Sequence, residues 1–534
     1  METPVQSKPA PARFPTFRRC VRAVFSRRGL FVFIGLITLF ALFHAEENFR
    51  GKRAWERYRT EAEARGVKFD FAAFVPPTVP DEQNAAINSV VAAWFPKPTA
   101  FDPNWPTLIG DAESRIASRR NSPDRRVIER FCDLVAMKEA MAEVESGKKK
   151  SGHSVAEQGR TPQERADAAV AVLEHLKVYQ PALDELRAAS KRPHVRYPIN
   201  YKLDDPFSIL LPHLARIKGI VQELKWQASA ELAIGRVDDA FADVMFMLWL
   251  TDSMKEEPFL IDQLVRVACL NLTMQPLWEG LAEHKWNDAQ LQKLQERLLQ
   301  FDFVTDMQGP FASERAASVS LMERLRRDTH SRPGITELFS MGDQPPLKPR
   351  WGAYLTSIVP RGWFYFEALN YCTLMDDEMR NGFDPQKKMI DAKQMEENDA
   401  RADYELTHVG KFGGIFAHRF FAQRLLPALK NATRKFAIGQ VTADEAALAC
   451  ALERYRLASG KFPETLNALA PTFMTKLPHD VLSGKPLKYE RVSDSEFVLS
   501  SVGWTYHEGF RTDFIPETSK SKDRPGDWIW HSAP

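Results

Sequence analysis

The chain has 534 residues, of which 72 are basic and 70 acidic, so its formal net charge is only +2. This balance supplies no positive field for nucleic acid and argues against that class of partner. Five cysteines lie far apart without a C-x-x-C pair, so they predict neither a disulfide framework nor a thiolate metal site. The length suggests about three or four domains.

A basic tail, residues 1–29, precedes the one long apolar run of the chain, residues 30–45. About seventeen helical residues rise roughly 26 Å, which approaches the ~30 Å thickness of a bilayer core. We therefore predict a single transmembrane helix that contacts the lipid bilayer through residues 30–45. Phe43-His44-Ala45 lacks the small residues of a cleavage site, which favours an uncleaved signal anchor over a cleaved signal peptide.

The flanks of this run predict its orientation. Arg27-Arg28 adjoin it directly on one side, whereas Glu46-Glu47 open the other side. Because Lys and Arg near the end of a span favour the cytoplasmic side, we expect the amino end inside and the bulk of the chain outside. This predicts a single-pass protein of the bacterial inner (cytoplasmic) membrane. Arg27-Arg28 also resemble a twin-arginine export signal, which stays open as an alternative.

Helical spacing of apolar residues predicts a mainly α protein after the anchor. Residues 46–85 combine a charged juxtamembrane helix with a Pro-rich connector, and residues 86–330 form a helical domain. Its clearest block, residues 211–303, predicts four antiparallel helices with short connections, an α-hairpin stack like that of tetratricopeptide repeats. Asn287 and Gln290 have the spacing of a capping box that begins the fourth helix.

Composition divides the remainder into a linker, a helical segment and an α+β domain. These are residues 331–350, rich in proline, residues 351–440, with helical periodicity, and residues 441–534. Thr442 and Glu445 have capping-box spacing, so we expect a helix to begin there and to end at Gly460. Alternating apolar and polar residues beyond it predict an antiparallel hairpin.

Two motifs come close to known sites for phosphate or metal. Residues 147–154 differ from a P-loop at one position, where His153 replaces the lysine, and a helix rather than a strand precedes them. We therefore interpret them as a loop. His408 and His418 could bind zinc together only if the fold brought them close, and no H-E-x-x-H motif accompanies them.

Two further clusters have a structural interpretation. Residues 376–378 are acidic, and on a helix such a run usually faces solvent. The densest aromatic group consists of Trp351, Trp363, Phe364, Tyr365 and Phe366. We predict that this group packs in a core, with a groove or a membrane contact as the alternative. No residue is assigned a catalytic, cofactor-binding or metal-binding role, and no cofactor is expected.

Four segments near the end of the chain resemble, in order and spacing, the globular part of a type II secretion major pseudopilin. They are residues 455–464, 477–480, 484–489 and 497–503. The resemblance agrees with the helix and hairpin expected in this region. The calcium loop of that family carries several Asp residues, whereas residues 503–509 offer only Glu508. Because calcium needs several oxygen ligands, the resemblance implies no calcium site here.

The chain as a whole is similar to a group of large, signal-anchored bacterial proteins of unknown function, which carry the motif of residues 76–84 after the anchor. This likeness supplies no activity, and three functions stay open. The first is a membrane-tethered scaffold that binds a protein partner in the cell envelope, because helical arrays without catalytic motifs usually bind. The others are a component of a secretion or pilus-like apparatus, and an enzyme whose site is assembled from distant residues.

Overall fold

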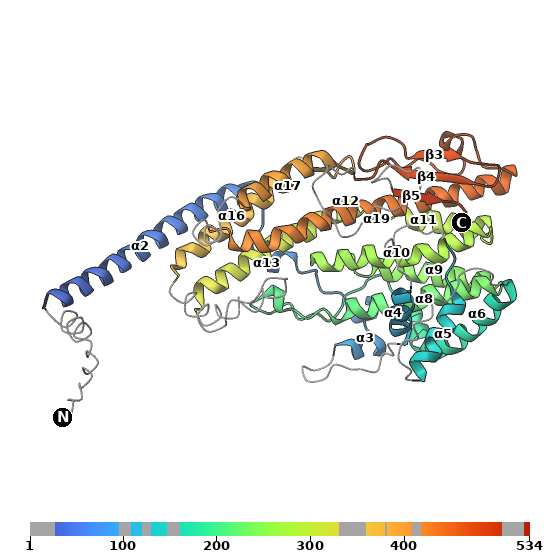
Figure 1. Cartoon of the computed structure of the whole chain (residues 1–534), viewed down its shortest axis with the longest axis horizontal. Helices are drawn as coiled ribbons and strands as arrows, with labels where there is room; N and C mark the ends of the chain where they lie inside the picture. The colour runs from blue at the N-terminus through green and yellow to red at the C-terminus, as the bar shows by residue number, and fades with distance from the viewer. Residues whose placement is uncertain are drawn as a thin grey trace, which may run out of the picture. The chain divides into compact units, whose positions relative to one another are not determined.

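The computed structural model describes residues 27–95, 108–119, 130–146, 161–329, 359–379, 382–407, 418–504 and 528–533. Over these residues the protein is mainly helical, with two small antiparallel sheets (Figure 1), which confirms the predicted mainly α class. The chain divides into two compact units. One comprises Met1–Gly66 and Met322–Asn370, and the other comprises Val67–Leu321 and Tyr371–Pro534.

The first unit is built on α2 (Arg27–Ala64) and the first half of α16 (Arg361–Met379). α2 joins the predicted anchor and the predicted charged helix into one uninterrupted helix. It stops just before Gly66, whose φ of +89° lies in the left-handed region that favours glycine. The helix therefore continues beyond the apolar run, and no linker separates the run from the charged residues that follow.

Short helices begin the second unit, and local side chains set where several of them start. Asn88 and Asp133 each accept a hydrogen bond from the first turn of a helix, and Thr161 forms a capping box with Glu164. The elements are η1 (Phe71–Phe74), η2 (Asp81–Gln83), α3 (Ser89–Trp94), α4 (Leu108–Arg119), α5 (Leu134–Glu145), α6 (Pro162–Leu176), η3 (Lys177–Tyr179), α7 (Gln180–Ala189) and η4 (Pro206–Ser208).

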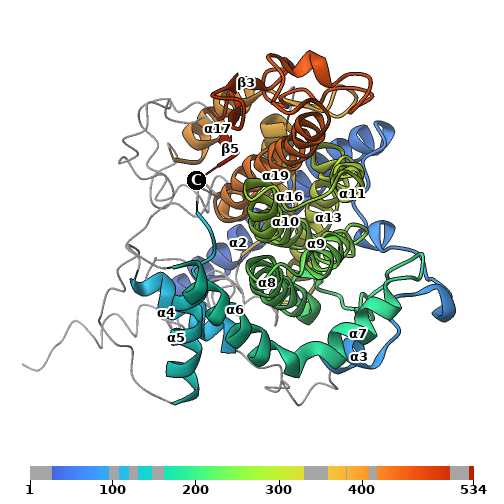
Figure 2. The same cartoon turned by 90° about the vertical axis from the view of Figure 1, so that its right-hand side faces the viewer.

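The four helices predicted between residues 211 and 303 are present. They are α8 (Pro212–Ala233), α9 (Val237–Asp252), α10 (Leu260–Ala282) and α11 (Asp288–Leu298). Asn287 and Gln290 form the predicted capping box at the start of α11. Figure 2 shows α8, α9 and α10 side by side, and each of the three packs against the other two.

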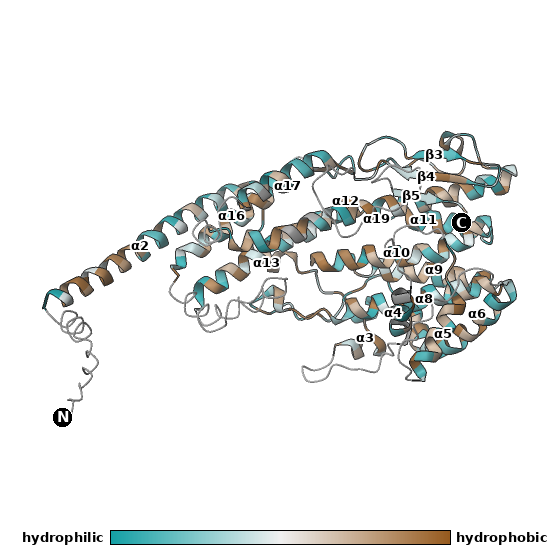
Figure 3. Cartoon of the chain, in the orientation of Figure 1, coloured by the Kyte–Doolittle hydropathy of each residue, from teal (hydrophilic) through white to brown (hydrophobic). Residues whose placement is uncertain are grey.

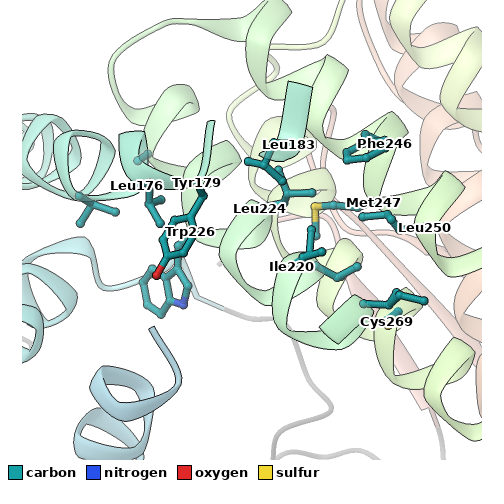
Figure 4. Close-up of a cluster of buried hydrophobic side chains, with 14 of the residues drawn as sticks. Leu176, Tyr179, Leu183, Ile220, Leu224, Trp226, Phe246, Met247, Leu250 and Cys269 are labelled. Atoms are coloured by element: carbon teal, nitrogen blue, oxygen red, sulfur yellow. The ribbon is translucent and has the colours of Figure 1, made fainter. Parts of the chain in front are cut away.

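A hydrophobic core of the second unit lies where α6 to α10 meet. Leu183 of α7, Leu224 of α8 and Met247 of α9 lie together in it (Figure 4), each at most 1% exposed. Burying a large aliphatic side chain stabilises the fold by about 1.5–3 kcal/mol relative to leaving it in water. This core therefore accounts for the close association of the predicted helices.

The helices after α11 differ in one respect from the prediction. They are α12 (Phe303–Asp306), α13 (Gln308–Arg327), α16, α17 (Ala392–Thr407) and α19 (Phe420–Ser459), and a short hairpin of β1 (Phe383–Asp384) and β2 (Met389–Ile390) precedes α17. The predicted helix start at Thr442 is wrong, because α19 runs through that position without a break. The helix does end at Gly460, whose φ is +78°.

A three-stranded antiparallel sheet follows α19. The predicted hairpin is present as β3 (Lys488–Arg491) and β4 (Phe497–Ser501), with Tyr489 paired to Leu499. A third strand, β5 (Trp528–His531), pairs with the other side of β4 and was not predicted. α19 packs against β4 and β5, so a long helix supports the sheet.

Candidate functional site

The first half of α2 exposes its apolar side chains. The large apolar residues from Leu30 to Phe43 are 45% to 75% exposed, and Figure 3 shows this part of α2 as a continuous hydrophobic stretch. Soluble proteins rarely expose an apolar surface of this extent. Thr38 donates its hydroxyl to the Ile34 carbonyl at 2.9 Å, so the one polar side chain in the stretch is satisfied within the helix.

The length and composition of this segment are also those of a membrane-spanning helix. Among the residues that the structure describes, α2 is the one helix long and apolar enough to cross a membrane, and none of its most apolar 18-residue window is buried. A core helix would instead have been covered by its neighbours. This half of α2 is therefore a candidate membrane span by its length, composition and exposure.

The second half of α2 is attached to the first unit along one face. Glu47, Gly51, Trp55 and Ala62 are the buried residues of the helix. Their spacing places them on one side of a 3.6-residue helix. Trp55 is only 2% exposed and stacks on Tyr58 with ring centroids 5.8 Å apart. The helix thus changes from fully exposed to one-sided burial within a few residues of Phe43.

The contact with α16 depends on two glycines. A Cβ atom added to Gly51 would collide with the Gly362 carbonyl, and one added to Gly362 would collide with the backbone of Glu47 and Asn48. Only glycine allows the two backbones to approach this closely. No local sequence pattern could pair these two glycines, because they are more than 300 residues apart.

Polar bonds fix the same contact. The Gly362 amide donates to the Asn48 Oδ1 at 2.6 Å, and the Trp363 indole donates to the Glu47 Oε2 at 3.0 Å. Arg50 pairs with the other oxygen of Glu47 at 2.9 Å. The close approach of the two backbones and two hydrogen bonds therefore join α2 to α16, and the ion pair within α2 orients the Glu47 carboxylate. We call the residues 47, 48, 51, 362 and 363 the anchor seat.

The predicted aromatic group lies partly in this region. Phe364 is 7% exposed, and the Tyr365 ring lies 4.7 Å from the Arg326 guanidinium. The Phe366 ring lies 5.9 Å from the guanidinium of Arg50. Together with Trp363, these side chains support the interpretation that the group packs within the protein. Trp351 lies outside the described residues.

The motif of residues 76–84 holds two distant segments together. The Asn84 Oδ1 accepts from the amides of Ala86 and Arg196, at 3.0 and 2.8 Å, and its Nδ2 donates to the Arg196 carbonyl at 2.9 Å. The Arg196 guanidinium donates to the Pro76 carbonyl at 3.1 Å. Asn84 is 4% exposed, so this residue of the motif forms a buried structural clasp, whereas residues 80–83 are exposed.

Carboxyl groups converge where α19 meets the loop before β3. Asp480 accepts from the Leu482 amide at 2.9 Å, from the Ser501 hydroxyl at 3.1 Å and from the Val502 amide at 2.8 Å. Asp444 accepts from the Gln440 amide group at 3.2 Å. The charges of Asp480 and Asp444 both act on Glu445, whose buried Oε1 has no hydrogen-bond partner among the described residues.

Burial changes the acidity of this group. Burial, with the charges of Asp302 and Asp480 added, raises the pKa of Asp444 to about 7, against the opposing effects of Gln440 and Lys388. Burial, together with repulsion from the charges of Asp480 and Asp444, raises the pKa of Glu445 well above its usual range. These carboxyls are therefore poised to hold protons near neutral pH, yet they are at most 7% exposed.

The other sequence motifs lie partly outside the described residues. Residues 147–154, His408 and Glu508 lie outside the described residues. Asp376 forms an ion pair with Arg315 at 3.2 Å, so at least this member of the acidic run contributes to packing between helices. In the part of the chain that the structure describes, no group of three or more His, Cys, Asp or Glu side chains could hold a metal ion.

One buried histidine escaped the sequence analysis. His213 of α8 is fully buried between the rings of Tyr197 and Phe95, with centroids 4.5 and 5.8 Å away. Neither ring nitrogen has a hydrogen-bond partner, and burial lowers its pKa to about 3. It is therefore neutral and behaves as an aromatic core residue. Nothing in the spacing of the sequence marks it as different from an exposed histidine.

Comparison of the chain with protein-family models, with curated proteins and with solved structures gave no match in any of the three searches.

Proposed function

We propose that the protein is a membrane-tethered, extracytoplasmic helical scaffold that binds a protein partner in the bacterial cell envelope. The observation that carries this proposal is the continuity of α2, whose exposed apolar half extends directly into the anchor seat. A signal that is removed after export would need no such attachment. Held by Gly51 and Gly362, the helix keeps the first unit at the membrane, with the amino end on the cytoplasmic side.

Internal ion pairs support a scaffold role for the helices of the second unit. Arg266 is fully buried and donates to Asp252 at 2.6 Å and to Asp306 at 3.1 Å. Arg297 also donates to Asp252, at 2.6 Å. Charged groups that bind one another between helices serve to define one arrangement of those helices. These ion pairs join residues of different helices within the fold, as expected for a rigid framework.

The carboxyl groups of α19 and the neighbouring loop support an enzymatic function less well than a scaffold. A general acid or base must reach a substrate proton, whereas Asp444, Glu445 and Asp480 are 2% to 7% exposed. Asp480 moreover accepts three hydrogen bonds from its own chain. We therefore assign these carboxyls to folding.

A second candidate is a component of a type II secretion or pilus-like apparatus. The observation that favours it is the packing of α19 against a three-stranded antiparallel sheet, in the region that resembles a major pseudopilin. In this alternative, β3 to β5 would contact other subunits of the apparatus, and the anchor would place the domain at the membrane.

Site-specific photo-crosslinking in the native membrane tests both. A photoreactive phenylalanine analogue would replace Leu210, which is 79% exposed beside α8, or Val492, which is 55% exposed beside β3. One discrete protein adduct from position 210 supports the scaffold, and adducts with secretion-apparatus subunits from position 492 support the alternative. The absence of a reproducible protein adduct from either position would contradict both.

A further inference from the structure

The face of α2 opposite the anchor seat carries an aromatic residue and two arginines. Phe49 is 63% exposed, and Arg53 and Arg57 are exposed as well. Residues 49, 53 and 57 are spaced four apart, so they follow one another along one side of the helix. This face begins six residues beyond Phe43, where the exposed apolar run ends.

The two arginines differ from the other basic residues of this helix. Three of the others have acidic partners on α2: Arg50 pairs with Glu47 at 2.9 Å, Lys52 with Glu56 at 3.6 Å and Arg59 with Glu63 at 2.7 Å. Within the described chain, Arg53 and Arg57 have neither a hydrogen bond nor an ion pair. Their positive charge is therefore free to attract an anion from outside the protein.

Helix geometry places this charge beside the membrane. At about 1.5 Å per residue, Phe49 lies roughly 9 Å and Arg53 roughly 15 Å beyond Phe43. Side chains on a helix tilt toward its amino end, and an arginine can extend its guanidinium several ångströms in that direction. The headgroup layer is roughly 5–8 Å thick on each side of the bilayer, and salt screens charge over about 8 Å. Arg53 therefore reaches the lipid phosphates, and Arg57 lies within their field.

We propose that Phe49, Arg53 and Arg57 form a binding surface for the phosphate groups of anionic lipids on the side of the membrane where α2 emerges. A guanidinium binds phosphate through two parallel hydrogen bonds, and an aromatic ring is favourable at the membrane interface. Such binding would fix the rotation of α2 about its own axis, with the anchor seat on the opposite side of the helix. This inference rests on the proposed membrane anchoring and adds a lipid class to it.

Native mass spectrometry of the full-length protein tests the proposal, in detergent micelles that contain equal amounts of phosphatidylglycerol and phosphatidylcholine. The variant with Arg53→Gln and Arg57→Gln is compared with the variant that carries Lys52→Gln and Arg59→Gln. Both lose two positive charges from the same helix, but only the first changes the proposed surface.

We expect the natural protein to retain phosphatidylglycerol preferentially. In the first variant, the ratio of bound phosphatidylglycerol to bound phosphatidylcholine should fall by at least about fivefold. One basic residue near an anionic surface contributes about this factor. The second variant should keep most of the preference. Equal loss in both variants, or no preference in the natural protein, would overturn the proposal.

Extraction of membranes at alkaline pH separates this result from a failure of the anchor. Both variants keep residues 30–45 intact, so both should stay in the membrane fraction. If the natural protein leaves the membrane, the proposed anchoring itself fails. If all proteins stay and the lipid preference is unchanged in the first variant, only the lipid-binding surface fails.

Discussion

Gly51 on α2 and Gly362 on α16 approach so closely that neither position has room for a Cβ atom. The backbone contact is accompanied by a hydrogen bond from the Gly362 amide to Asn48 and by one from the Trp363 indole to Glu47. These contacts lie a few residues beyond the exposed apolar half of α2. They determine how the apolar half of α2 is joined to the rest of the first unit.

We expect Gly362→Ala to weaken the anchor seat. The added methyl group must displace the backbone of α2, and overpacking of this kind typically costs about 1–3 kcal/mol. Hydrogen exchange measures the effect locally, because the amides of residues 361–370 should lose protection. Gly219→Ala is the matched control: that helical glycine has nothing within 4 Å of an added Cβ. It should leave stability unchanged or raise it by up to about 1 kcal/mol.

Asn84→Ala should destabilise the second unit. The substitution removes three hydrogen bonds and leaves the Arg196 amide and carbonyl without their partner, at a cost of about 1–3 kcal/mol. Urea denaturation followed by tryptophan fluorescence measures this change. Asn200→Ala provides the control, because Asn200 is exposed and accepts only from the nearby Lys202 amide. Equal effects of the two substitutions would show that Asn84 is not a structural clasp.

Arg266→Ala should be more damaging than the loss of an exposed arginine. It removes a fully buried cation that binds Asp252 and Asp306, and breaking a buried ion pair costs about 3–5 kcal/mol. Arg327→Ala breaks a surface pair with Glu323, in which the arginine side chain is 67% exposed, and should cost less than about 1 kcal/mol. Thermal unfolding of both variants checks the difference, and a similar change in both would refute the assigned role of Arg266.

The raised pKa of Asp444 leads us to predict that the stability of the protein depends on pH. The pKa of Asp444 is about 7 in the folded protein, against about 3.9 in an unfolded chain. Between these values the folded state retains a proton that the unfolded state has released. The free energy of unfolding should therefore fall as pH rises from about 4 to 7. Asp444→Asn cannot titrate, so this variant should reduce the slope and should be more stable than the natural protein at pH 8.

Asp238→Asn is the control for this titration. Asp238 is exposed, and its replacement keeps an oxygen that can accept from Gln290, as the Asp444 replacement does for Gln440. We expect this control to follow the pH profile of the natural protein. An unchanged slope in Asp444→Asn would mean that Asp444 is ionised in the fold at acidic pH.

Local patterns predicted the features that depend on neighbouring residues. The apolar run became the exposed half of α2, and Asn287 with Gln290 became a true capping box. Thr442 and Glu445 have the same kind of spacing, yet α19 continues through them. Glu445 is buried beside Asp480 instead of reaching back to the backbone of Thr442. A capping pattern is thus insufficient where tertiary contacts stabilise a longer helix.

Long-range contacts could not be predicted from spacing. Gly51 and Gly362 are separated by most of the helical region. The residues around either glycine contain no pattern that predicts contact with the other. Asn84 was marked by its motif, but its bond to Arg196 depends on the path of the chain between them. The third strand of the sheet was missed for a similar reason, because β5 is short and follows β4 only after a long segment.

The most direct test of the tether is alkaline carbonate extraction of membranes that contain the full-length protein. We expect the natural protein to remain in the membrane pellet, together with Val178→Arg, which alters an exposed apolar residue outside the run. The double variant Leu36→Arg and Ile37→Arg should shift to the soluble fraction, because each arginine costs about 2.5–3.5 kcal/mol at the centre of a span. Recovery of the natural protein in the soluble fraction would contradict the account.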